Sequence, residues 1–202
     1  MNIETVPSPT SILARLRTET RPEHDAIEGA LDLMSETLRP EAYRRTLERF
    51  YGFYSPMEAA LERVGGWTQR GLDMVERQKS PLLEADLRAL GVANPEALAV
   101  CTDLPPHGTV SAAFGCLYVL EGATLGGQII KGAVEKSLGV TLETGGRFFI
   151  GYGDRTGLMW QAFRTAVTAF AVTPADQDEA VAAAKATFIK LRAWIVAEGN
   201  AR

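Results

Sequence analysis

His24 is the residue whose surroundings best suit metal ligation, and the chain has only one other histidine, His107. Glu28 lies four residues after His24, so on a helix the two side chains share a face one turn apart. A carboxylate there can accept the proton of one ring nitrogen and leave the other nitrogen free as a basic metal ligand. A solvated surface histidine is the alternative interpretation. His107 lies in a Pro-Pro-His-Gly turn, where a surface role is expected.

Arg17 extends this pattern, because it lies seven residues before His24. On an uninterrupted helix the two residues are about 10 Å apart along the axis. That spacing suits a flat ligand bound at its centre by His24 and at an acidic edge by Arg17. Pro22 can bend the helix between them, and an exposed helix covered with ion pairs would show the same spacing.

The second candidate site is the sequence YVLEGATLGGQ at residues 118–128. Each glycine inside a helix costs roughly 1 kcal/mol relative to alanine, so the glycines need a reason. One reason is close packing between helices, and another is a backbone that approaches a flat ligand without side chains in the way. Gly122 and Gly126 are four residues apart and open one helix face. The spacing matches neither the dinucleotide-binding nor the P-loop pattern.

The elements that position these residues are expected to be helical almost throughout. Apolar residues recur in steps of three and four, and Pro40 and Gly65 are typical of the start and end of a helix. The stretch 148–152 is too short and isolated to form a sheet. The expected helices cover residues 10–31 (one kinked helix or two abutting ones), 40–64, 80–90, 108–138, 155–170 and 174–198. The sequence therefore predicts an all-α single domain over residues 10–198, preceded by a flexible segment at residues 1–9.

The composition agrees with one folded domain and excludes several classes of protein. Of the 202 residues, 46% are hydrophobic and 23% charged, which suits a single domain with a sizeable core. The net charge of -4 argues against a broad nucleic-acid surface. Two cysteines outside any CxxC pair favour a reduced, cytoplasmic environment. We expect no signal peptide and no membrane span, since no run of about 18 apolar residues is present.

Arg17 with His24 and Glu28, followed by YVLEGATLGGQII from residue 118, resembles the haem oxygenase family. The likeness is greatest to the bacterial branch that includes members associated with bacteriophytochromes. It extends from about residue 8 to 197, and the glycine-rich segment is its most specific part. The resemblance implies an all-helical fold with haem between a proximal helix and a kinked distal helix.

The resemblance also implies roles for particular residues on the two sides of the haem. His24 matches the proximal ligand of the iron, and Glu28 matches the carboxylate that orients it. Gly122 and Gly126 match the distal glycines that pass close over the haem. Ala123 occupies the position at which many relatives carry an aspartate that organises water for oxygen activation.

Three further residues resemble contacts to the haem propionates. Arg17 matches a basic residue near the propionates, and Arg164 matches a second such contact more loosely. Tyr118 lies one residue from the position at which some relatives carry a propionate-binding tyrosine.

The activity implied by the resemblance is oxidative cleavage of haem to biliverdin, carbon monoxide and ferrous iron. Electrons must come from outside, from a ferredoxin or a similar reductase system, because the chain lacks a nucleotide fingerprint and an iron–sulfur cysteine set. A bacteriophytochrome is a possible acceptor of the biliverdin. Ala123 keeps open the alternative of a haem-binding protein for storage, delivery or sensing that does not degrade haem. A helical scaffold that binds no haem is the third interpretation.

Overall fold

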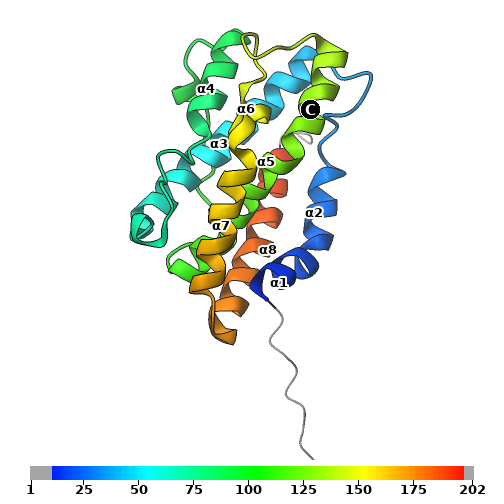
Figure 1. Cartoon of the computed structure of the whole chain (residues 1–202). Coiled ribbons are helices and arrows are strands. Elements are labelled where there is room, and N and C mark those ends of the chain that lie inside the picture. Colours follow the sequence, from blue (N-terminus) through cyan, green and yellow to red (C-terminus); the bar gives the residue numbers. More distant parts are fainter. Residues whose placement is uncertain (1–10, 198–202) are drawn as a thin grey trace, which may run out of the picture.

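The computed structural model describes residues 11–197, and every regular element in that range is helical (Figure 1). The α-helices are α1 (Ile12–Glu19), α2 (Arg21–Glu28), α3 (Pro40–Val64), α4 (Ser80–Ala89), α5 (Val110–Leu138), α6 (Arg147–Ile150), α7 (Thr156–Phe170) and α8 (Pro174–Val196). Three 3-10 turns join them: η1 (Thr68–Arg70), η2 (Pro95–Ala97) and η3 (Gly153–Arg155). The all-α prediction is confirmed, whereas the flexible segment predicted at residues 1–9 lies outside the described residues.

Two abutting helices, rather than one kinked helix, form the N-terminal part of the fold. α1 ends at Thr20, whose hydroxyl donates a 2.7 Å hydrogen bond to the carbonyl of Leu16. α2 begins directly afterwards, with Pro22 in its first turn, where a missing backbone N–H costs little. Because Arg17 lies on α1 and His24 on α2, the distance of about 10 Å expected for one continuous helix does not apply.

The longer helices begin and end close to the predicted positions. α3 begins at Pro40 and ends at Gly65, which has a φ of 74° and so adopts a conformation that favours glycine. α5 is one continuous helix, and the Thr109 side chain caps its start by accepting from the Ala112 amide. The apolar stretch 148–152 is not a strand, because α6 occupies Arg147–Ile150 as a single helical turn. The glycines within α5 therefore do not interrupt it.

α5 is the central helix of the core, and it packs most extensively against α8 (Figure 1). By length and hydropathy alone, α5 is the one helix among the described residues that would be able to cross a membrane. Its most apolar window, however, is 56% buried inside the fold, against α8, α6, α7 and α3. Its apolar character is therefore explained by its position in the core.

Gly115 sets how closely α5 approaches α8. A Cβ added at Gly115 would lie 2.1 Å from the carbonyl oxygen of Ala180 and 2.9 Å from the Cβ of Ala183. We expect Gly115→Ala to lower the free energy of unfolding by roughly 2–3 kcal/mol, because the helices must separate to admit the methyl group. Urea unfolding measures this loss. Gly132→Ala is the control on the same helix, because its added Cβ meets nothing within 4 Å, and it should raise stability by up to about 1 kcal/mol. Equal urea-unfolding midpoints for Gly115→Ala and Gly132→Ala would contradict the role of Gly115 in the packing of α5 against α8.

Candidate functional site

A mostly apolar cavity of about 310 Å³ lies between α2 and α5. α2 packs against α8 rather than α5, which leaves space between the two helices. Aromatic side chains from α3, α6, α7 and α8 close the remaining walls. These are Phe50, Tyr54, Phe148, Phe149, Trp160 and Phe188. A cavity of this kind suits a flat, largely apolar ligand.

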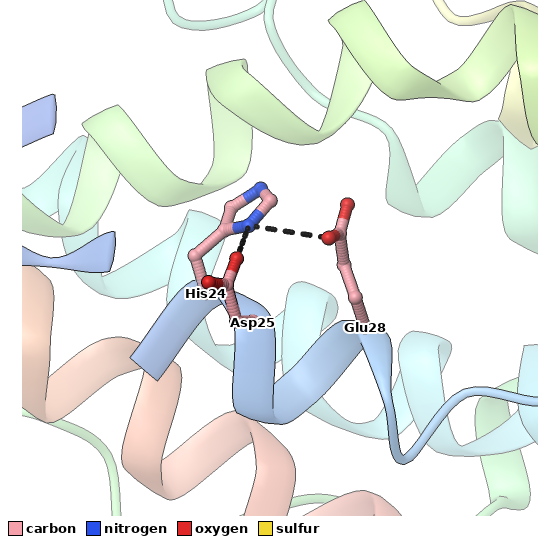
Figure 2. A group of neighbouring side chains, drawn as sticks. All are labelled: His24, Asp25 and Glu28. Carbon is pink, nitrogen blue, oxygen red and sulfur yellow. Dashed lines mark ion pairs between the residues drawn. The ribbon is translucent and has the colours of Figure 1, made fainter. Parts of the chain in front are cut away.

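His24 lines the cavity from α2 and presents one free ring nitrogen to it. Its Nδ1 lies 3.5 Å from Glu28 Oε2 and 3.5 Å from Asp25 Oδ1. Figure 2 shows Nδ1 facing these two carboxylates, whereas the other ring nitrogen, Nε2, points away from α2 towards α5. The ring of Phe188 packs edge-on against the imidazole at 5.7 Å. Nδ1 thus lies within ion-pair distance of two carboxylates, and Nε2 is the ring nitrogen left on the α5 side.

Asp25 is a member of this group that the helical spacing did not predict. Neighbouring residues on a helix do not face each other, yet the Asp25 carboxylate turns to the imidazole of His24 (Figure 2). Arg21, one turn earlier, donates a 2.9 Å hydrogen bond from Nε to Asp25 Oδ2, and this hydrogen bond lowers the pKa of the Asp25 carboxyl below its usual value. Asp25 is therefore an anion beside Nδ1 at neutral pH.

The glycines of α5 divide into two kinds. A Cβ added at Gly122 or Gly126 would meet nothing within 4 Å, and both residues line the cavity. A Cβ added at Gly127 would lie 2.3 Å from the carbonyl oxygen of Phe149. Close packing thus explains Gly127, whereas Gly122 and Gly126 leave open space opposite α2. Ala123 also lines the cavity and is exposed.

The predicted propionate contacts lie at different distances from the cavity. Tyr118 lines it and packs against Trp160, with ring centroids 6.0 Å apart. Burial raises the pKa of Tyr118, and a hydrogen bond with Thr20 and the nearby charge of Arg17 partly offset that rise. Arg17 and Arg164 are exposed and do not line the cavity. They lie on α1 and α7, which contact each other.

One polar wall was missed by the sequence interpretation. Lys79 lines the cavity although it is only 2% exposed, and it binds Glu121, the residue before Gly122. Glu121 was visible within the glycine-rich segment, but Lys79 lies 42 positions away. No local spacing relates the two, so no sequence signal indicated this contact.

The comparison with known families agrees with this geometry. The family model described as "Heme oxygenase" matches residues 10–197, which is nearly the whole chain. The chain belongs to the haem oxygenase family. A haem oxygenase of Xanthomonas campestris pv. campestris (strain 8004) is 29% identical over 162 residues, which cover 79% of this chain and 92% of that protein.

Solved structures of haem oxygenases share the fold. The enzyme of Leptospira interrogans matches with a TM-score of 0.75 and 22% identity, covering 92% of this chain and 98% of that one. Haem oxygenase-1 of Synechocystis sp. PCC 6803, solved in complex with haem, matches with a TM-score of 0.76 and 19% identity. The match covers 95% of this chain and 94% of that one. The Neisseria meningitidis enzyme, solved with NO and CO bound, matches with a TM-score of 0.76 and 20% identity. The match covers 93% of this chain and 91% of that one.

As a member of the haem oxygenase family, the chain is a haem-binding oxidoreductase, and the cavity fits that role. A flat macrocycle needs apolar walls, a ligand atom on one face and little side-chain bulk on the other. The cavity has an aromatic lining, His24 on the α2 side, and open space at Gly122 and Gly126 on α5. The structure therefore brings six predicted site residues to one cavity. They are His24, Glu28, Tyr118, Gly122, Ala123 and Gly126.

Proposed function

We propose that this haem oxygenase cleaves haem to biliverdin, carbon monoxide and ferrous iron, with His24 as the iron ligand. The observation that carries the proposal is the open space at Gly122 and Gly126, which line the same cavity as His24. A helix gains nothing from two unpacked glycines, and each costs roughly 1 kcal/mol relative to alanine. A ligand that needs the space accounts for this cost.

The proximal residues would hold and orient the ligand. His24 would bind the iron through Nε2, while Glu28 and Asp25 would accept the Nδ1 proton and make Nε2 a stronger donor. The edge contact of Phe188 limits rotation of the ring. When bound, haem supplies the redox chemistry at its iron and is also the molecule that is opened.

The remaining walls would decide where the ring is opened. The glycine face of α5 lets the backbone lie close to one side of the macrocycle, and the aromatic walls keep bulk water away. Arg17 and Arg164 would bind the acidic edge from α1 and α7 and so set the in-plane orientation of the ligand. That orientation would decide which edge of the macrocycle is opened, and hence the biliverdin isomer.

We also propose an external electron donor of the ferredoxin or reductase type, a cytoplasmic location, and a bacteriophytochrome as a possible acceptor of biliverdin. The decisive experiment combines the chain, haemin, catalase, oxygen and a ferredoxin reductase system. Loss of the Soret band together with growth of a bilin absorbance is the expected result, and chromatography of the product identifies the isomer. A Soret band that survives turnover conditions would contradict the proposal.

A haem-binding protein for storage, delivery or sensing is the second candidate, and Ala123 is the observation that favours it. The side chain is small, apolar and exposed in the cavity, so it cannot organise water as a carboxylate does. Under this alternative the chain binds haem, and the turnover experiment yields no bilin.

Ala123→Asp tests how much this position controls the reaction. The new carboxylate has room at the exposed position and would hold water beside the haem, so we expect a changed rate of Soret loss in the turnover assay. Ala169→Asp, on the exposed face of α7 and away from the cavity, is the matched control and should leave the rate unaltered. Identical rates for Ala123→Asp and the unchanged protein would show that position 123 does not govern distal water.

A further inference from the structure

A buried ionic cluster borders the cavity and includes Glu121 of α5, the residue before Gly122. We name it the Glu121 cluster, and it consists of Arg77, Lys79, Glu121 and Tyr152. The carboxylate of Glu121 is 1% exposed and accepts from Arg77 Nη1 at 2.5 Å, Lys79 Nζ at 2.9 Å and Tyr152 Oη at 2.6 Å. Burial, and then the charge of Glu121, raises the pKa of Tyr152 well above its usual value, so its hydroxyl stays protonated as a donor.

Lys79 is held in this cluster as a charged ammonium. Its Nζ donates to Glu121 Oε1 at 2.9 Å, to Tyr152 Oη at 2.9 Å and to the carbonyl of Arg77 at 3.0 Å. Three acceptors match the three N–H donors of an ammonium, whereas a neutral amine has only two. The side chain of Lys79 is therefore held in one position by three hydrogen bonds.

The backbone of Lys79 is anchored as firmly as its side chain. Its amide donates to Glu58 Oε1 at 2.7 Å, and Ser80 donates to the same carboxylate through its amide and its hydroxyl. Glu58 lies on α3 and Ser80 begins α4, so two helices hold Lys79 against α5. The position of the ammonium relative to Gly122 is thus set by the fold.

Lys79 is the member of the Glu121 cluster that lines the cavity. Two buried carboxylates face the two cations here, because Glu121 binds Arg77 and Lys79 directly, and Glu58, which accepts from the Lys79 amide, also interacts with the charge of Lys79. Arg77 Nε is buried and has no hydrogen-bond partner among the described residues. Because a buried charge is weakly screened, its potential reaches farther than that of a surface lysine.

We propose that Lys79 is an electrostatic positioning residue of the cavity, which favours negatively charged ligands on the α5 side of the haem. The charge of Lys79 would provide part of the polar environment that the apolar side chain of Ala123 does not provide. The inference rests on the proposed binding of haem between His24 and the glycine face. It deepens that proposal by naming a residue outside the glycine-rich segment that acts on what binds opposite His24.

The test measures how tightly the ferric haem complex binds azide, an anion, and imidazole, a neutral ligand. Lys79→Met should weaken azide binding by about tenfold, because it removes one unit of buried positive charge, and should leave imidazole binding unaltered. Lys136→Met makes the same substitution at a lysine whose side chain is 78% exposed, and it should change neither the azide affinity nor the imidazole affinity.

Glu121→Gln should change the azide affinity in the opposite direction. The amide keeps the shape of the side chain but removes its negative charge, so azide binding should strengthen by about tenfold. A residue with a merely structural role would weaken binding in both variants. Circular dichroism checks that both variants fold, because each breaks a buried ion pair on one side. Glu121→Gln keeps the size of the side chain and one accepting oxygen, so it carries the test if Lys79→Met does not fold.

The outcomes separate this inference from the proposed function. Opposite changes in azide affinity, with imidazole binding constant, support the role of Lys79. Unchanged azide affinity in the folded variants, or an equal loss of azide and imidazole binding, would overturn it while haem binding stands. An unchanged protein that gives no haem complex would instead overturn the proposed function.

Discussion

His24→Ala is expected to abolish normal axial ligation of haem and to lower turnover by at least about a hundredfold. Removing a residue that only orients a metal ligand already costs about 10–100-fold, so loss of the ligand itself should cost more. Electronic and resonance Raman spectra of the reconstituted ferric and ferrous protein report the axial ligand directly. Added imidazole should restore ligation in part, because the truncated side chain leaves a space of its own shape beside Phe188.

His107→Ala is the matched control, because it makes the same change at the other histidine. The His107 ring contacts the carbonyl of Pro105 at 2.7 Å and does not line the cavity. The spectra and turnover of His107→Ala should equal those of the unchanged protein. Spectra of His24→Ala that are identical to those of the unchanged protein would refute His24 as the ligand.

Gly126→Leu is expected to weaken haem binding by about 10–100-fold while the fold is kept. The added side chain projects into the open face of α5, and overfilling a packed site costs roughly 1–3 kcal/mol. Stability without haem should not fall, because leucine favours a helix more than glycine does. Haemin titration followed at the Soret band, with circular dichroism of the apoprotein, measures both quantities.

Gly132→Leu is the control on the same helix. An added Cβ at Gly132 also meets nothing within 4 Å, but Gly132 does not line the cavity. Both variants should gain similar helix stability, and only Gly126→Leu should lose haem affinity. Equal haem affinities would mean that the open face of α5 is not where the ligand lies.

The features that the sequence predicted well depend on residues close together in the chain. The ends of α3, the extent of α5 and the all-helical class follow from proline, glycine and apolar spacing. The pairing of His24 with Glu28 follows from one helical turn, and the structure places their atoms 3.5 Å apart. The four-residue step from Gly122 to Gly126 likewise predicted a single open face.

The sequence left alternatives wherever distant segments meet. It did not separate packing from ligand space for the glycines of α5, because only the contact with Phe149 distinguishes Gly127 from Gly122. It related Arg17 to His24 as though on one helix, but α1 ends between them.

By itself, then, the sequence determined the class of fold, because helix periodicity and capping act over a few residues. Its resemblance to known sequences indicated the family, and six of the predicted site residues line one cavity. Only the tertiary structure decided that Lys79 meets Glu121 beside the cavity and that α2 packs against α8. Such contacts join positions far apart in the chain. They arise from the packing of whole helices, which no local pattern records.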